Sequence, residues 1–226
     1  MATWECNVLN RNRSIPQKFY RRSADEVAID LLGRFLVRQL EGTKLIARIV
    51  ETEAYLGASD RASHAWQGRR TPRNETLFNP GGVAYVYFIY GMYYCLNAVS
   101  GDAANGDAVL IRAAEPLAGA EVMAAGRGLS GSLEPGDLTG GPGKLCQALS
   151  IDKGFDGQGL QRGPLRVAWG EPVDPSRVVA GPRIGIDYAG EAAQWPLRFA
   201  VAGNPHVSKP HPWKTSGYFR GARSSM

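Results

Sequence analysis

Cysteine and histidine are scarce in this chain of 226 residues, which has three of each. They form no C-x-x-C pair and show no zinc-ligand spacing. The cysteines are odd in number and far apart, so the sequence does not indicate a disulfide framework either. We therefore expect a reducing compartment and a site that uses no metal and no other cofactor. The positions concerned are Cys6, Cys95, Cys146, His64, His206 and His211.

Long apolar runs are also missing. The first residues, M-A-T-W-E-C-N-V-L-N-R-N-R, lack the apolar stretch of a secretion signal. No run approaches the roughly 18 apolar residues that a membrane-spanning helix needs. We expect a protein that has no membrane partner and is not secreted. A cytosolic or nuclear location is the default.

The overall composition is that of a soluble globular protein, with 44% hydrophobic and 21% charged residues. The length suits one domain with a sizeable core. A formal charge of +5 permits nucleic-acid binding without proving it. Acidic residues are absent from residues 11–22 and after Glu191, so both ends are basic. Solvated tails explain such basic ends as well as binding does.

Hydrophobic patterning and turn residues predict a single α+β domain built on an antiparallel sheet. We expect residues 1–22 to be basic and irregular, residues 23–208 to form the domain, and residues 209–226 to be a basic flexible tail. Strands are expected near 36–40, 45–54, 108–113, 165–169, 183–186 and 197–201, with a hairpin at 82–100. Helices are expected near 118–125 and 144–149, and a Gly-rich surface loop over 126–143.

A further helix is expected after Ser23, because Ser23-Ala-Asp-Glu26 resembles a capping box. The apolar residues that follow at helical spacing would form its buried face. They are Val27, Leu31, Leu32 and Phe35.

Two carboxylates stand out in the strand R-I-V-E-T-E-A-Y. Because side chains alternate along a strand, Ile49, Glu51, Glu53 and Tyr55 share one face. One interpretation is a solvated edge with an aromatic ring lying across it. The other is a site-lining carboxylate with an aromatic platform beside it. The apolar neighbours favour partial burial, which raises a carboxylate's pKa and suits it to general-base catalysis.

Tyrosine is concentrated in residues 85–94, where two β-prone runs meet at Tyr90-Gly91. Glycine supplies the positive φ that a tight hairpin turn requires, so Tyr90 is expected at the tip and exposed. An aromatic side chain at such a tip is suited to wedging into a DNA groove. Tyr85 or Tyr87, on one face, could stack a base. The alternative is that most of these tyrosines belong to the core of the sheet.

The segment between the strand and the hairpin, residues 57–82, is long and rich in Gly and Pro. Such segments are more often functional or disordered than plain connectors. Several of its side chains carry hydrogen-bond donors that fit phosphate groups, although a lone histidine is usually structural. These side chains are His64, Arg69, Arg70, Thr71 and Arg73.

Together these segments resemble the alkyladenine (3-methyladenine) DNA glycosylase family of the mammalian type, from about Ala24 to Ser208. The similarity is densest in E-T-E-A-Y-L-G, R-x-T-P-R-N, Y-V-Y-x-I-Y-G-M-Y-x-C-x-N, V-L-I-R-A-x-E-P-L and G-P-G-K-L-C-Q-A-L. That many ordered motifs form a specific signal, whereas each alone is weak. The resemblance implies one mixed domain around a curved antiparallel β-sheet with a protruding β-hairpin.

The resemblance also implies catalytic roles. Glu53 would be the general base and Glu51 a structural neighbour. Glu53 would activate a water molecule that Arg112 and the main-chain carbonyl of Ile184 also hold. No lysine is expected beside this site, so hydrolysis without a Schiff-base lyase step is expected.

A base pocket and a DNA-binding surface follow from the same resemblance. Tyr55 and Tyr87 would sandwich the flipped base, and His64 would close the pocket. His64 and the main chain near Ala62 would read the base edge, while Asn97 would crowd the exocyclic amine of guanine. Tyr90 would fill the space that the base leaves, with Met92 and Tyr93 beside it, and phosphates would be bound by Arg69, Thr71 and Lys144. The loop at 126–140 and the tail after residue 208 depart from the family pattern.

The function implied is that of a monofunctional DNA glycosylase of base excision repair. It would act as a monomer, in the cytoplasm at the nucleoid of a bacterium or in the nucleus of a eukaryote. It would flip alkylated or deaminated purines (3-methyladenine, 7-methylguanine, hypoxanthine, ethenoadenine) out of double-stranded DNA and leave an abasic site. A non-catalytic binder of damaged or distorted nucleic acid is the alternative, although the presence of Glu53 and Arg112 argues against it. A base deaminase is disfavoured because the H-x-E and C-x-x-C zinc ligands are missing.

Overall fold

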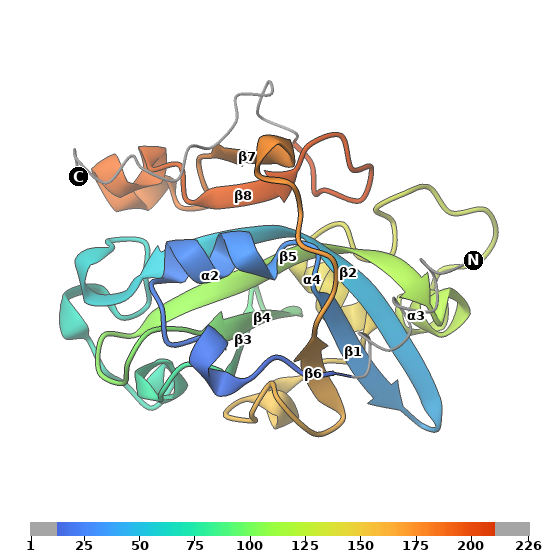
Figure 1. Ribbon diagram of the computed structural model, residues 1–226, viewed down its shortest axis with the longest axis horizontal. Helices are drawn as coiled ribbons and strands as arrows, with labels where there is room; N and C mark the ends of the chain where they lie inside the picture. The colour runs from blue at the N-terminus through green and yellow to red at the C-terminus, as the bar shows by residue number, and fades with distance from the viewer. Residues whose placement is uncertain (1–12, 211–226) are drawn as a thin grey trace.

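The computed structural model describes residues 13–210, which form a single α+β domain around one eight-stranded antiparallel sheet (Figure 1). Six strands lie in the order β3-β4-β5-β2-β1-β6, and β8 pairs with both β2 and β7. The predicted fold class is confirmed. The strands are β1 Phe35–Leu40, β2 Thr43–Leu56, β3 Ala84–Ile89, β4 Tyr93–Val99, β5 Asp107–Ala118, β6 Leu165–Ala168, β7 Val178–Gly181 and β8 Arg198–Val201.

The central strand β2 explains the curvature of the sheet. Along one edge it pairs with β5 over almost its whole length. Along the other edge, residues 43–48 pair with β1, whereas residues 51–53 pair with β8. Strand β2 therefore pairs with two different strands along the same edge. Strands β7 and β8 lie apart from β1 and β6 (Figure 1).

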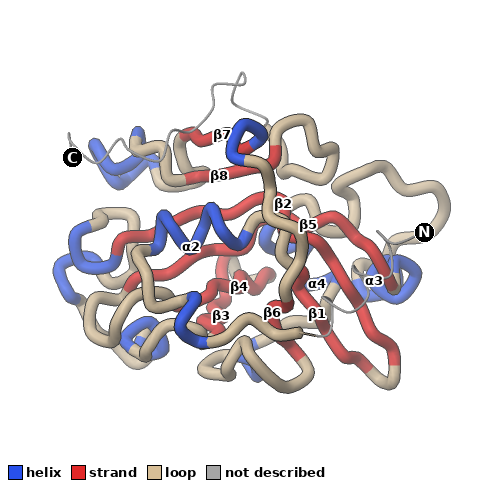
Figure 2. Tube along the Cα trace, in the orientation of Figure 1, coloured by secondary structure: helices blue, strands red, loops and turns tan. Residues whose placement is uncertain are grey.

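The helices are short and lie around the strands (Figure 2). The α-helices are α2 Ala24–Leu31, α3 Ala120–Gly126 and α4 Pro142–Ala148. The 3-10 helices are η1 Gln17–Phe19, η2 Gly57–Ser59, η3 Trp66–Gly68, η4 Glu75–Phe78, η5 Lys153–Phe155, η6 Pro175–Arg177 and η7 Asp187–Gln194. Three of them fall in the long segment at 57–82, which is therefore structured.

Helix α2 packs along β2 and β5 (Figure 1). The predicted capping pair is in contact, since the Ser23 hydroxyl donates to Glu26 Oε2 at 3.0 Å. Gly33, with φ +81°, follows the helix, and a Cβ there would lie 2.1 Å from the carbonyl oxygen of Glu171. The chain turns at this glycine, so Phe35 belongs to β1 and its predicted place on the helix face was wrong.

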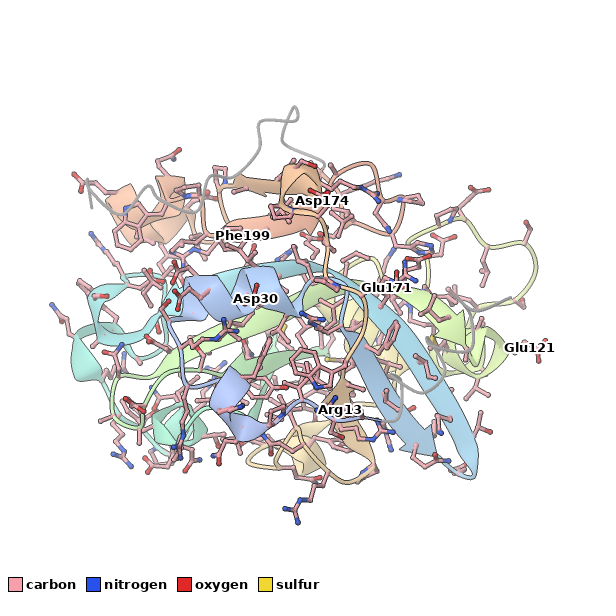
Figure 3. The ribbon with its side chains drawn as sticks, in the orientation of Figure 1. Arg13, Asp30, Glu121, Glu171, Asp174 and Phe199 are labelled. Atoms are coloured by element: carbon pink, nitrogen blue, oxygen red, sulfur yellow. The ribbon has the colours of Figure 1, made fainter. Side chains whose placement is uncertain are left out.

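The core includes residues from both ends of the described chain. Phe199 of β8, labelled in Figure 3, is fully buried. Ile15 and Tyr20, from the segment expected to be irregular, are fully buried as well. The expected strand at 183–186 was wrong. The strand lies earlier, as β7, and the chain leaves it at Pro182, which has no N–H to donate to a ladder.

Candidate active site

A cavity of about 600 Å³ opens between the hairpin β3–β4, the strands β2 and β5, and the segment after β7. Its volume is typical of a site for a small ligand. All of the residues that the resemblance assigned to catalysis or to a base pocket meet in its wall. They are Glu53, Tyr55, Ala62, His64, Tyr87, Asn97, Arg112 and Ile184. Three residues assigned to DNA contacts, Tyr90, Tyr93 and Lys144, line it as well.

Glu53 is fully buried in the wall of this cavity. The Tyr55 hydroxyl donates to its Oε2 at 2.9 Å, and Arg112 Nη1 lies 3.2 Å from its Oε1. The amide N–H of Ile184 also donates to Oε1, at 2.9 Å. The contact between Ile184 and the carboxylate is therefore made by the amide, whereas the expected contribution of Ile184 was its carbonyl. The solvated-edge interpretation is wrong, because Glu51 is fully buried as well.

Arg112 owes its position to an irregularity in the sheet. Between Ile49 and Glu51 strand β2 has one extra residue, and between Glu51 and Thr52 the paired residues of β5 pass from Ala113 to Ile111, so the ladder skips Arg112. Such bulges turn side chains in directions that a regular strand does not offer. Here Arg112 Nε lies 2.8 Å from Glu51 Oε1, while its Nη1 faces Glu53. Burial lowers the pKa of Arg112, but the two carboxylates outweigh this and the pKa is raised.

Glu51 connects the site to the end of the domain. Its Oε1 accepts from Arg198 Nε at 2.6 Å and from the Ser208 hydroxyl at 2.9 Å, besides Arg112. Its Oε2 accepts from the Ser208 amide at 2.7 Å. Of these partners, Arg198 and Ser208 lie outside the cavity wall, whereas Arg112 is shared with Glu53, and the supporting role implied for Glu51 stays a prediction. The carboxylate thereby joins β2, β5 and β8 to the segment at residue 208.

Each of the two tyrosines expected to sandwich a base has one face covered by the protein. The guanidinium of Arg183 lies 4.7 Å from the centre of the Tyr55 ring. Tyr85 stacks on Tyr87 with 5.4 Å between ring centres and 27° between planes. Burial raises the pKa of both Tyr55 and Tyr87, so their hydroxyls keep their protons. A planar ligand would therefore stack on the opposite faces.

His64 lies against the tyrosine pair. Its ring centre is 4.7 Å from that of Tyr87, and its Nδ1 is 2.9 Å from the Tyr85 hydroxyl. Burial lowers the pKa of His64, and the positive charge of Arg73 lowers it further. The imidazole is therefore neutral at pH 7, with one donor and one acceptor nitrogen.

Two other predicted pocket residues have their polar groups held by the protein. The buried Asn97 donates from Nδ2 to the carbonyl of Tyr85 at 3.2 Å. The amide of Ala62 donates to Asp60 Oδ1 at 3.0 Å, and its carbonyl accepts from the Tyr188 hydroxyl at 3.4 Å. The main chain at Ala62 therefore has a fixed orientation in the cavity wall.

The hairpin tip has the geometry expected of it. Tyr90 and Gly91 both have positive φ, +56° and +69°, and the Met92 amide donates to the Ile89 carbonyl at 3.2 Å. Positive φ at both central residues is typical of the type I′ turn of tight hairpins. Tyr90 is 78% exposed and Met92 60% exposed. Tyr93, next along the strand, lines the cavity.

A second hollow adjoins the cavity and shares Ser63, His64 and Tyr188 with it. Its lining includes the expected phosphate ligands Arg69 and Thr71, together with two more cations, Arg61 and Arg73. Thr71 is partly engaged, since its hydroxyl donates to Asn74 Oδ1 at 3.0 Å.

Lys144 lines the same cavity as Glu53. Its amine donates to the carbonyl of Gly136 at 3.3 Å. The expectation that no lysine adjoins the site was therefore wrong. Helix α4, far away in sequence, brings it there.

Several residues in or behind the site were not singled out from the sequence. Asp60 and Arg183 form a buried ion pair, although 123 positions separate them. No spacing pattern links residues so far apart, and Asp60, between Ser59 and Arg61, has no apolar neighbour that would indicate burial. Others in this group are Arg127 and Tyr188, which line the cavity, and Arg198 and Ser208, which contact Glu51.

Comparison with known proteins identifies the family of this chain. The family model described as methylpurine-DNA glycosylase (MPG) matches residues 18–205. The chain belongs to the methylpurine-DNA glycosylase family. It is accordingly a DNA N-glycosylase, a hydrolase of N-glycosyl bonds, as the resemblance implied.

Individual relatives agree with this assignment. The DNA-3-methyladenine glycosylase of Homo sapiens is 47% identical over 209 residues, covering 84% of this chain and 66% of its own length. The mouse (Mus musculus) protein of the same name is 48% identical over 206 residues, covering 84% and 60%. A protein of Clostridium botulinum with a provisional name as 3-methyladenine DNA glycosylase is 46% identical, covering 89% and 99%. Within residues 13–210 no helix is long and apolar enough to span a bilayer.

Proposed function

We propose that this protein removes damaged purines from double-stranded DNA by flipping them into the cavity and hydrolysing the N-glycosidic bond. The observation that carries the proposal is Glu53, a fully buried carboxylate in a cavity walled by Tyr55, Tyr87 and His64. The curated relatives named for 3-methyladenine indicate alkylated purines as the substrate class. Related lesions would be 7-methylguanine, hypoxanthine and ethenoadenine. The abasic site left behind is the starting point of base excision repair.

The flipped base would lie between Tyr55 and Tyr87, on the faces that Arg183 and Tyr85 do not cover. Flipping costs a few kcal/mol, and least for a damaged or mispaired base. Each aromatic contact returns about 1–3 kcal/mol, so two tyrosines roughly offset the cost. Alkylation at a ring nitrogen makes the base cationic, which favours an electron-rich aromatic pocket.

In the chemical step, Glu53 would accept a proton from a water molecule that attacks C1′ of the deoxyribose. The glycosidic electron pair leaves with the base, and the sugar passes through an oxocarbenium-like state, as in glycoside hydrolysis. Arg112 and the Ile184 amide hold the carboxylate in place by contacts of 3.2 Å and 2.9 Å. A general base contributes about 10²–10⁴ in rate, and the weakened bond of an alkylated base supplies much of the remainder.

Selection among purines would come from the base edge. Because His64 Nδ1 is engaged with Tyr85, Nε2 is the ring nitrogen that would address a ligand. The main chain at Ala62 would contribute beside it. Asn97, held by the Tyr85 carbonyl, would crowd the exocyclic amine of an undamaged guanine. A site discriminates strongly when the wrong base leaves the site's own buried polar groups unpaired.

Binding to the duplex would use the hairpin tip and the cations around the cavity. Tyr90 would enter the space left by the base, with Met92 and Tyr93 beside it. Arg69 and Thr71 on one side and Lys144 on the other would bind phosphates, and the protein would act as a monomer. No Schiff base with Lys144 is proposed, because its role would be to bind a phosphate; its amine also donates a hydrogen bond to the carbonyl of Gly136. The expected location is the nucleoid or the nucleus.

The test is a panel of duplexes, each with one lesion, incubated with the protein and then treated with alkali. Strand breaks at the lesion and no borohydride-trapped protein–DNA complex are the expected result. Binding without breaks at any lesion would support the non-catalytic binder instead. A trapped complex that is lost in K144A would show that Lys144 acts as a lyase.

A further inference from the structure

We propose that Asp60 and Arg183 are positioning residues of the base pocket. Their buried ion pair would hold the ring of Tyr55, the main chain at Ala62 and the amide of Ile184 in one arrangement. The inference rests on the proposed function, because it concerns the same cavity. Neither side chain lies in the cavity wall, so the pair would act through the residues that do.

The ion pair is two-pronged and closed to solvent. Both side chains are fully buried, Arg183 Nη2 donates to Asp60 Oδ1 at 2.9 Å, and Nη1 donates to Asp60 Oδ2. The same guanidinium donates to the carbonyls of Ala54 at 2.8 Å and Ala192 at 3.2 Å. It therefore ties the end of β2 to η7. A planar guanidinium with several donors fixes direction as well as distance.

The first group held by the pair is Tyr55. The guanidinium lies 4.7 Å from the centre of the Tyr55 ring, and the Tyr55 hydroxyl donates to Glu53. A ring fixed on one face and at its hydroxyl has little freedom to tilt. The face on which a flipped base would stack is thereby set by Arg183.

The second group is the chain that leads to His64. Asp60 Oδ1 accepts from the Ala62 amide at 3.0 Å, and Asp60 Oδ2 accepts from the Leu56 amide at 3.1 Å. One carboxylate therefore shapes the turn from residue 56 to residue 62 while it holds Arg183. The main chain expected to read the base edge takes its orientation from this turn.

The third group is the general base itself. Ile184 follows Arg183 directly, and its amide donates to Glu53 Oε1 at 2.9 Å. A peptide bond is planar, so fixing Arg183 restricts the direction of the Ile184 N–H. The stacking face, the base edge and the catalytic carboxylate are thus aligned by a single ion pair.

Stability alone is a weak reason for such a pair. Removing two charges from water is expensive, and apolar replacements of buried ion pairs are often neutral or stabilising. Apolar side chains would not supply the orienting bonds that Asp60 and Arg183 make. The desolvation cost of burying Asp60 and Arg183 is therefore consistent with a role in orienting the residues of the cavity wall.

The experiment compares three variants. D60N/R183Q removes both charges together, so neither is left buried alone. R183K keeps the charge but not the planar fork. The matched control is R38Q, because Arg38 is also buried, lies 4.7 Å from the ring centre of Phe155 and donates to the Leu149 carbonyl at 3.1 Å, outside the cavity wall.

The measurements are the melting temperature, the Kd for a lesion duplex and the single-turnover rate of base release at saturating enzyme. Two lesions with different base edges, hypoxanthine and ethenoadenine, are used. D60N/R183Q should lose about 100-fold in rate, since a 1 Å misplacement is enough for this, while Kd changes far less. The ratio of the two lesion rates should change, R183K should be intermediate, and R38Q should keep its rate.

A rate loss in D60N/R183Q no larger than in R38Q at equal fraction folded would overturn the inference. So would a loss confined to Kd, or an unchanged lesion ratio in every variant that folds. If the double variant does not fold, the comparison of R183K with R38Q decides in the same way. Wild-type protein that releases no base would refute the proposed function instead.

Discussion

Glu51 and Glu53 carry the same group, lie two positions apart on one strand and are both fully buried. Their surroundings separate them. Glu51 accepts hydrogen bonds from Arg198 and Ser208, which lie outside the cavity wall, and from Arg112, which it shares with Glu53. Glu53 faces the cavity. We therefore expect the two carboxylates to have different tasks because of their partners, as paired acids do in many enzymes.

The variant E51Q tests this division at the level of stability. It removes the negative charge that stands between two buried guanidinium groups, Arg112 and Arg198. Breaking such a pair leaves a buried charge uncompensated, so the free energy of unfolding should fall by about 3–5 kcal/mol. Urea denaturation measures it. An unchanged urea midpoint would show that Glu51 does not hold the frame together.

His64 makes stability depend on pH. Burial, and next the charge of Arg73, lower its pKa below the ordinary 6.5. As pH falls below about 6.5 the unfolded chain takes up a proton at this site before the folded protein does, so stability decreases with falling pH until the lowered pKa is passed. In H64Q this contribution is missing.

The free energy of unfolding of wild type relative to H64Q should therefore drop on acidification, by at most about 1.4 kcal/mol per pH unit. Urea titrations between pH 5 and 8, roughly the range in which histidine titrates, would measure the difference. H206Q is the comparison: burial also lowers the pKa of His206, outside both hollows, so a drop of the same sign is expected there. A difference that stays constant with pH would contradict the assignment.

Among the elements, the β3–β4 hairpin shows a conflict between local preference and function. A type I′ turn favours Asn-Gly at its two central positions, yet the first is a bulky tyrosine at φ +56°. A left-handed conformation costs roughly 1–2 kcal/mol for such a residue. Strain of this kind, on an exposed aromatic side chain beside a cavity, is typical of functional sites.

Y90N should therefore separate stability from binding. Asparagine suits the turn, so the free energy of unfolding should rise by about 1 kcal/mol, while affinity for lesion DNA falls because the wedge is gone. Y90F, which keeps both the ring and the strain, should match the wild type. Denaturation and fluorescence anisotropy measure the two quantities. Unchanged affinity in Y90N would place Tyr90 outside the DNA.

Elements with strong periodicity or turn chemistry were predictable from sequence, as the hairpin and strand β2 illustrate. The misplaced strand at 183–186 shows the limit, because the short apolar run around Ile184 fits a strand and a loop equally well. The bulge that directs Arg112 was not predictable, since it depends on the registration of β2 with β5. The buried face predicted for helix α2 wrongly included Phe35. The chain turns at Gly33 because the main chain of Glu171 packs against it, and this contact between distant residues cannot be read from the sequence.

For the molecule as a whole, the sequence resemblance identified most residues of the cavity wall. The motifs around Glu53, Tyr87 and Arg112 supply many of the residues that line it. Contacts between residues far apart in the sequence could not be predicted. The contact of Glu51 with Ser208 spans 157 positions, and the pair of Asp60 with Arg183 spans 123. Only the folded chain brings the members of each pair together.

If the cations around the cavity bind phosphates, the affinity for DNA should depend on salt concentration. Each phosphate contact that is lost should reduce the slope of log affinity against log salt by about 1. R69A and K144A should each show this loss with undamaged duplex. R70A is the control, since Arg70 neighbours Arg69 but is ion-paired with Glu75. A full slope in R69A, or a reduced one only in R70A, would mean that the DNA follows another path.

The most direct test of the central claim is the single-turnover release of a damaged purine by wild type and by E53Q on the same lesion duplex. Glutamine keeps the size of Glu53 but cannot take a proton from water. Wild type should release the base and leave an alkali-labile site, whereas E53Q should bind the duplex and lose at least about 10² in rate. Base release by E53Q at the wild-type rate would contradict the assignment of Glu53 as the general base.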